Sequence, residues 1–164
     1  MTDPTAAFAQ ALAQAHAPLD AFAALERLVQ ARLGATLVTV TTVEEAGTLA
    51  RRSYSNMPEA YPVSGTKRTE RNAWTEVVLE RGETFVANSL AEIATVFPDH
   101  VLIGALGCGS VVNLPVVLAG ELIATLNLLD VEGYFTPERV ALIQAELSLP
   151  ALAAQLAHDR LTAG

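Results

Sequence analysis

The chain has 164 residues, 51% of them hydrophobic, and its 18 acidic and 10 basic residues give a formal net charge of -8. This composition excludes a disordered chain, because disordered chains combine high net charge with low hydrophobicity. It also argues against nucleic-acid binding, which needs an excess of basic residues. At this length we expect one domain.

The cysteine content and the N-terminus favour a cytoplasmic protein. Cys108 is the one cysteine, so an internal disulfide is impossible, as is usual in a reducing compartment. Residues 1–4 lack the basic start of a signal peptide. Glycine, proline and asparagine residues interrupt the long apolar stretch at 100–130. We therefore interpret that stretch as two buried strands, with no membrane partner.

The N-terminal third of the chain predicts two helices and a β-hairpin. Residues 3–33 follow a helical pattern, with Pro4 suited to a first helical position and Pro18 dividing a short helix from a longer one. The β-branched run at 37–43 predicts a strand, and 48–55 predicts the returning strand of a hairpin.

The middle of the chain predicts short elements separated by loops. Prolines and a glycine predict a loop over 56–69, which is long enough to be a binding loop. The elements expected after it are a helix at 70–81, a strand at 83–87, a helix capped by Asn88 or Ser89, and a short helix from Leu102 to Leu106.

The C-terminal third predicts an apolar hairpin and a long helix. The hairpin strands are 110–118 and 121–129, and Thr136-Pro137-Glu138 has the order of a helix start. Pro150 lies inside the helical pattern and should kink or split the helix. Paired strands with segregated helices predict an α+β fold with an antiparallel sheet.

The stretch from Ser110 to Leu129, followed by Phe135-Thr136-Pro137-Glu138, resembles the C-terminal half of the GAF domain family of small-molecule sensors. The resemblance spans about residues 19–150. It implies a standalone bacterial-type GAF protein with a central, PAS-related antiparallel sheet of five to six strands. The terminal helices would cover one face, and a ligand pocket would lie on the other. We accordingly divide the chain into an N-terminal helical extension at 1–18 and a GAF-like domain at 19–164, including the C-terminal helix.

The chemistries of well-known GAF members are not matched in this sequence. Free methionine-(R)-sulfoxide reductases use several cysteines, and the position of their active cysteine falls near Gly104 here, not at Cys108. The signature of cyclic-nucleotide GAF domains cannot be aligned, since Lys67 is the one lysine. Bilin-binding members attach the pigment through a cysteine often followed by histidine, whereas Cys108 precedes Gly109. The ligand or cofactor therefore stays unknown.

Basic residues cluster between positions 51 and 81. Six of the ten basic residues lie there against four acidic ones, so this segment is mildly basic within an acidic chain. Such a segment favours an anionic ligand, because arginine pairs bidentately with carboxylate or phosphate; the alternative is an ordinary solvated surface. Strand alternation puts Arg52 and Tyr54 on one face, so that only one of Arg51 and Arg52 can face a pocket.

Other candidates for the pocket are polar or aromatic residues in apolar surroundings. Asn113 and Asn127 lie in adjacent apolar strands, and an unpaired buried amide costs about 1–3 kcal/mol, so each must bond to backbone, water, a ligand or the other amide. The ligand-binding candidates are Arg52, Tyr54, Tyr61, Trp74, Phe97, Asp99, Cys108, Ser110, Asn113 and Asn127.

Cys108 is a weak catalytic candidate. With His100 or Asp99 nearby in sequence it could support thiol or redox chemistry, although a free cysteine more often packs as a small apolar residue. No histidine and cysteine spacing matches a metal site. A Cys108-dependent enzyme, distantly like free methionine-(R)-sulfoxide reductase, is therefore the alternative to a binding domain.

We predict a sensory GAF domain that binds a small molecule and forms a homodimer. Its terminal helices are rich in alanine and leucine, a pattern that permits close packing between helices of two copies. If the domain stands alone, its output would pass through a protein effector or be the binding itself. A third hypothesis is a purely structural dimerisation module, which a side-chain-filled pocket would favour.

Overall fold

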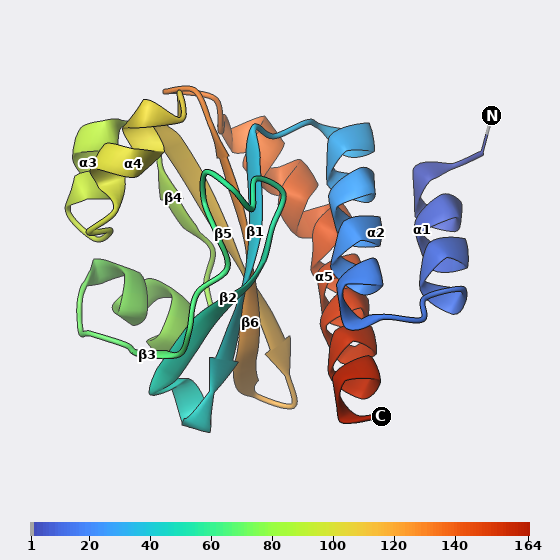
Figure 1. The fold of residues 1–164 in the computed structure, drawn as a ribbon. Helices are drawn as coiled ribbons and strands as arrows, with labels where there is room; N and C mark the ends of the chain where they lie inside the picture. The colour runs from blue at the N-terminus through green and yellow to red at the C-terminus, as the bar shows by residue number, and fades with distance from the viewer. Residues whose placement is uncertain (1) are drawn as a thin grey trace.

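The fold is an antiparallel sheet with long helices on one face and short elements on the other (Figure 1). The computed structural model describes residues 2–164. Its six strands lie in the order β3-β2-β1-β6-β5-β4. Their bounds are β1 Leu37–Glu44, β2 Leu49–Ser55, β3 Lys67–Arg68, β4 Phe85–Ala87, β5 Ser110–Leu118 and β6 Glu121–Asp130. The predicted α+β class with a five- to six-stranded antiparallel sheet is confirmed.

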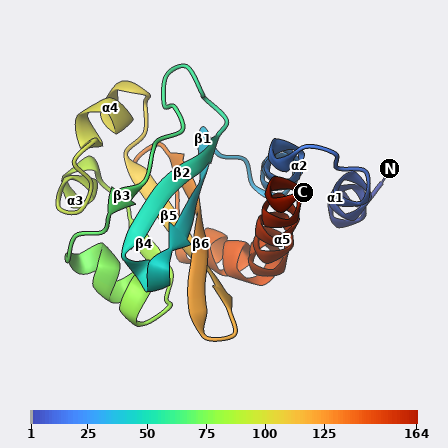
Figure 2. The same ribbon diagram turned by 60° about the horizontal axis from the view of Figure 1, so that its bottom comes forward.

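The terminal helices are α1 Pro4–Ala13, α2 Pro18–Arg32 and α5 Pro137–Ala163. Of these helices, α2 and α5 pack on one face of the sheet, and α1 packs on the outer side of α2, as Figures 1 and 2 show. Proline opens all three, and Asp3 and Thr136 cap α1 and α5 by accepting a backbone N–H. The side chain of Asp20 accepts the backbone N–H groups of His16 and Ala17 and so secures the start of α2.

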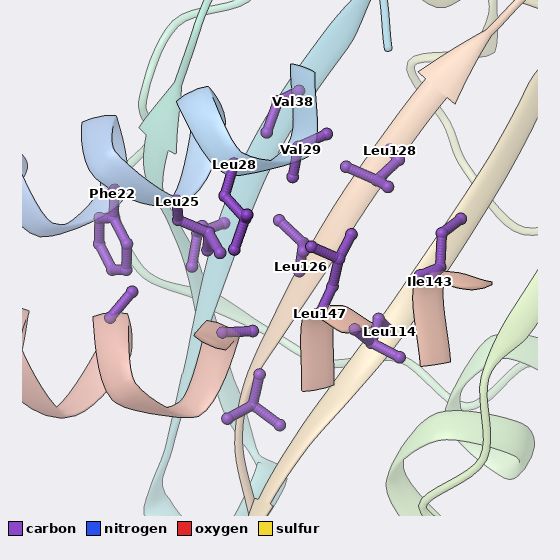
Figure 3. Close-up of a cluster of buried hydrophobic side chains, with 14 of the residues drawn as sticks. Phe22, Leu25, Leu28, Val29, Val38, Leu114, Leu126, Leu128, Ile143 and Leu147 are labelled. Carbon is purple, nitrogen blue, oxygen red and sulfur yellow. The ribbon is translucent and has the colours of Figure 1, made fainter. Parts of the chain in front are cut away.

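The core on this face is apolar and closed. Figure 3 shows Leu25 and Leu28 of α2 meeting Leu126 of β6 and Leu147 of α5. All four side chains are at most 2% exposed. At about 25 cal/mol per Å² of apolar surface buried, this layer is a main source of folding free energy.

The opposite face of the sheet carries short elements. They are the π-helical turn η2 Thr75–Glu80 and the helices α3 Leu90–Ala94 and α4 His100–Ala105. Ile93 and Ile103 are buried and form a second, smaller cluster with Tyr61 and Val111. This cluster fills only part of the space over the sheet.

Two predicted elements differ from the observed ones. The predicted loop at 56–69 contains the short strand β3, which pairs with Leu49 and Ala50 at the edge of the sheet. The predicted helix at 70–81 begins later, because the side chain of Asn72 accepts the backbone N–H of Thr75 and caps a turn there.

Pro150 lies inside α5 but does not split it. Instead, the helix bends along its length, as Figure 2 shows. A proline removes one helical hydrogen bond and clashes with the preceding turn, so a bend is its usual consequence. By length and composition α5 could cross a membrane, but Ile143 and Leu147 are fully buried against the sheet.

Between Glu44 and Leu49 the β1–β2 connection contains the short 3₁₀ turn η1 Glu45–Gly47. Further along this hairpin, the pairing is interrupted by a bulge. Val40 pairs with Tyr54 and Thr41 pairs with Arg52, so Ser53 is an extra residue on β2. Neighbouring residues of β1 face opposite sides of the sheet, and the same therefore holds for Arg52 and Tyr54.

Candidate ligand-binding site

A cavity of about 260 Å³ lies over the sheet face that the terminal helices leave free. Strands β1, β5 and β6 form its floor, and the segments between β2 and β5 form its walls. Its lining residues are Thr39, Thr41, Arg52, Tyr61, Lys67, Trp74, Phe97, Pro98, Asp99, Ile103, Val111, Asn113, Thr125, Asn127 and Leu129.

The floor carries a closed network of side-chain hydrogen bonds centred on Asn127. Its Oδ1 accepts from Asn113 Nδ2 at 2.6 Å and from the Thr125 hydroxyl at 2.9 Å. Its Nδ2 donates to the hydroxyl oxygens of Thr39 at 3.1 Å and Thr41 at 3.0 Å. Asn127 thus makes the four hydrogen bonds that an amide can make. Asn113 and Asn127 therefore pair with each other while also lining the cavity.

Trp74 forms one wall of the cavity. The indole Nε1 donates to Asn113 Oδ1 at 3.1 Å, which fixes the ring over β5. Asn72, just before η2, orients this segment by donating from its side chain to the Val96 carbonyl at 3.3 Å. Because Trp74 is the chain's one tryptophan, its fluorescence reports on this wall.

The roof joins three segments through Arg52, Tyr61 and Asp99. The Arg52 guanidinium stacks on the Tyr61 ring at 3.7 Å and donates to the Pro62 carbonyl at 2.8 Å. It also lies 3.4 Å from the Asp99 carboxylate, to which the Tyr61 hydroxyl donates a short hydrogen bond. Burial and the Asp99 carboxylate raise the pKa of Tyr61, so this hydroxyl stays protonated and remains a donor.

One end of the cavity is apolar. Val111 and Leu129 pair across β5 and β6, and Ile103 of α4 and Phe97 cover them. The cavity therefore combines an apolar end, a polar floor and a roof that carries charge. This combination is typical of sites for small organic molecules.

Seven of the ten predicted site residues line the cavity. They are Arg52, Tyr61, Trp74, Phe97, Asp99, Asn113 and Asn127. These residues come from β2, the loop after it, the start of η2 at its N-cap, the α3–α4 connection and the hairpin strands, so the fold gathers them from 76 positions of sequence, from 52 to 127.

Tyr54 lies on the opposite face of the sheet from the cavity. Its hydroxyl donates to Glu26 of α2 at 2.5 Å, and its ring packs against Phe22 at 5.9 Å between centroids. The expectation that Tyr54 and Arg52 share a face is wrong, because the bulge at Ser53 reverses the alternation.

Cys108 and Ser110 also lie outside the cavity lining. Cys108 is buried in the smaller cluster, and burial together with the charge of Asp130 raises the pKa of its thiol to about 11. His100 Nδ1 bonds to the Phe97 carbonyl rather than to this thiol. The Ser110 hydroxyl is fully buried and donates to the carbonyls of Asp130 and Val131, which secures the end of the hairpin.

Sequence reasoning missed the threonines of the floor. Thr39 and Thr41 alternate with Val38 and Val40 along β1, so the polar face was visible in the sequence. Because threonine is itself β-branched, the run predicts a strand without marking these two residues as polar site residues. Lys67 was included in the basic segment but not as a lining residue.

The described residues, 2–164, contain no group of three or more His, Cys, Asp or Glu side chains that could hold a metal ion. The donors around the cavity are hydroxyls, amides and cations, which suit an organic ligand.

Comparison with known proteins identifies the fold and the family. A model of the GAF domain matches residues 21–153. The GAF domain of a two-component sensor histidine kinase from Bacillus halodurans is 12% identical, covers 92% of this chain and 100% of that chain, and has a TM-score of 0.71. No curated protein sequence matches the chain.

Two further solved structures share the fold. The GAF domain of an Acinetobacter phosphoenolpyruvate-protein phosphotransferase is 11% identical, with 98% of each chain covered and a TM-score of 0.70. The chromophore-binding domain of a bacteriophytochrome from R. palustris is 11% identical, with 98% of this chain and 61% of that chain covered and a TM-score of 0.66. With its family match over most of its length and this architecture, the chain belongs to the GAF domain family, whose members are generally sensory and signalling domains.

Proposed function

We propose that this chain is a sensory domain that binds a small organic molecule in the cavity over β1, β5 and β6. The observation that carries the proposal is the cavity itself, with its saturated amide network, its apolar lining residues and a roof that carries charged groups. A purely structural module would gain nothing from a polar floor, because buried polar groups stabilise a fold less than apolar packing does. The structure from R. palustris that shares this fold is a chromophore-binding domain, which supports small-molecule binding as a use of the fold.

Native mass spectrometry of the freshly purified protein tests this proposal. We expect a small-molecule adduct that is lost from Thr41→Phe, since the added ring would occupy the cavity. Thr95→Phe is the control, because Thr95 is exposed and does not line the cavity. An adduct that survives Thr41→Phe in a folded protein would place the ligand elsewhere and refute the proposal.

We further propose that the domain forms a homodimer through α5. Leu149 and Leu156 are 73% and 43% exposed, and with the half-buried Leu142 they repeat every seven residues. A seven-residue apolar repeat is the pattern of helices that pack along each other, and a second copy presents the same stripe. A ligand-induced movement of the sheet could then reach a protein effector through paired helices.

The oligomeric state tests the dimer independently of the ligand. The molar mass can be measured by light scattering as the protein elutes from a size-exclusion column. Leu149→Glu combined with Leu156→Glu should convert a dimer to a monomer. Val131→Glu is the control, because Val131 is 55% exposed but lies outside α5. A wild-type protein that is monomeric at micromolar concentration would refute the dimer.

A further inference from the structure

We propose that the cavity is a carboxylate site: it takes a small monocarboxylate with an apolar body, and the carboxylate of the ligand replaces Asp99 on Arg52. This inference rests on the proposed function, that the cavity holds a small molecule, and adds the chemical class of that molecule and its orientation. It follows from the hydrogen-bond donors, the charge and the shape of the cavity.

The roof has an excess of donors. A guanidinium has five N–H groups. Arg52 engages the Pro62 carbonyl at 2.8 Å and Asp99 at 3.4 Å, and no other hydrogen bond of this side chain occurs within residues 2–164. Lys67 adds a second cation to the lining. With Asp99 as the one carboxylate among the lining residues, the cavity carries a net charge of +1 inside a chain of -8.

The floor also offers donors to a ligand. Thr39 and Thr41 accept from Asn127 Nδ2, so the proton of each hydroxyl is left to donate toward the cavity. Asn127 has no capacity left, and the Thr125 hydroxyl donates to it. These free protons favour a ligand that brings acceptors, and an anionic acceptor group matches the net charge of the lining.

Asp99 marks the place of that acceptor group. Its contact with Arg52 is single and long at 3.4 Å, whereas a ligand carboxylate can accept two parallel bonds from a guanidinium. The Asp99 side chain is 32% exposed, so water can solvate it once it leaves Arg52. Replacement of one carboxylate by another keeps the roof charge compensated throughout.

The rest of the cavity fits an apolar body. Phe97, Ile103, Val111 and Leu129 give part of the lining an apolar surface. A volume of about 260 Å³ lies just below the usual range for ligand sites, which runs from roughly 300 to 1,000 Å³, and so favours a ligand well below nucleotide size. A carboxylate the size of phenylacetate meets both requirements.

A panel of matched acids and amides tests the class. Benzoate, phenylacetate and hexanoate would each be titrated against the purified protein, with Trp74 fluorescence and Tm as readouts, beside benzamide, phenylacetamide and hexanamide. Acetate tests the need for an apolar body. We expect at least one of the larger acids to bind about tenfold or more tightly than its amide, because a hydrogen bond to a charged group is worth roughly 1.5–3 kcal/mol. Acetate should bind more weakly than that acid.

Variants locate the carboxylate. Arg52→Gln should weaken binding of the acid about tenfold or more and leave binding of the amide nearly unchanged. Arg52→Lys, which keeps the charge but not the planar fork, should fall between. Asp99→Asn should tighten binding of the acid several-fold, because the competing carboxylate is gone. Arg51→Gln is the control, since Arg51 pairs with Glu44 and does not line the cavity.

The outcomes separate this inference from the proposed function. Equal affinity for acids and amides, or no binding by any acid at millimolar concentration, overturns the carboxylate site. A neutral adduct in native mass spectrometry that Thr41→Phe removes would overturn the inference but support the binding function. Weaker binding of the acid in Asp99→Asn would overturn the exchange with Asp99.

Discussion

The two faces of the sheet use the same strands for opposite purposes. On the helix face, Val38 and Val40 of β1 and Leu126 of β6 are sealed under α2 and α5. On the cavity face, Thr39 of β1 and Asn127 of β6 hold a polar floor under an open space. Strand alternation therefore places adjacent residues in different surroundings, with a sealed apolar core on one face and the polar lining of a cavity on the other.

The helix face should show the largest loss of stability. Leu126→Ala removes a side chain that is 1% exposed and packs beside Leu147, as Figure 3 shows, and it leaves an apolar void. Loss of burial and the remaining cavity should lower the free energy of unfolding by about 3 kcal/mol. Urea denaturation measures this change. A loss below about 1 kcal/mol would mean that the helix layer is loosely packed.

Substitution of the adjacent residue, which faces the cavity, should lower the free energy of unfolding by less than Leu126→Ala does. Asn127→Ala leaves Asn113 Nδ2 and the Thr125 hydroxyl without their acceptor. This loss should lower the free energy of unfolding by about 2 kcal/mol. Water in the cavity can replace part of the network, so the cost should stay below that of Leu126→Ala. Trp74 emission should shift as well, because Asn113 holds the indole. A cost above that of Leu126→Ala would reverse the assigned roles of the two faces.

Much of this contrast could be predicted from the sequence. The period of 3.6 in the terminal helices, the apolar hairpin and the helix starts at proline predict the α+β class with an antiparallel sheet. The arrangement of the layers is what the resemblance to GAF domains implies. The two asparagines stood out because a buried amide needs a partner, and the structure pairs them at 2.6 Å. These features are local in sequence or follow from elementary pairing rules.

The bulge could not be predicted in the same way. Nothing in Arg52-Ser53-Tyr54 marks Ser53 as an extra residue, because the bulge results from the pairing of β2 with β1. Its effect is decisive, since it turns Arg52 to the cavity and Tyr54 to the helices. The ion pair between Arg52 and Asp99 likewise joins residues that are 47 positions apart in the sequence, and only the fold brings them together.

Two tyrosines bonded to carboxylates on opposite faces give a finer test. Tyr54→Phe removes the bond to Glu26 and should lower the free energy of unfolding by about 1 kcal/mol, with no change in Trp74 emission. Tyr61→Phe removes the hydrogen bond from the Tyr61 hydroxyl to Asp99 in the roof and should change the Trp74 emission. Denaturation and fluorescence of both variants check this. The same emission change in both would contradict the separation of the faces.

The thiol of Cys108 should be nearly unreactive in the folded protein near neutral pH. Cys108 lies in the smaller cluster on the cavity face but does not line the cavity. Because burial raises its thiol pKa to about 11, the thiolate should make up only about one thousandth of the thiol at pH of about 8. Labelling with an aromatic disulfide should be slow in the native protein and fast in urea.

The pH dependence of stability sharpens the same prediction. The folded thiol has a higher pKa than the unfolded one, so the neutral thiol stabilises the fold fully below its ordinary pKa of 9.0. That contribution is lost as the pH rises from there to about 11, where the folded thiol ionises too. Urea denaturation of the wild type and Cys108→Ala should therefore show a difference in stability that shrinks across this interval. A constant difference, with fast native labelling, would mean that the thiol is accessible and that the cluster on this face opens readily.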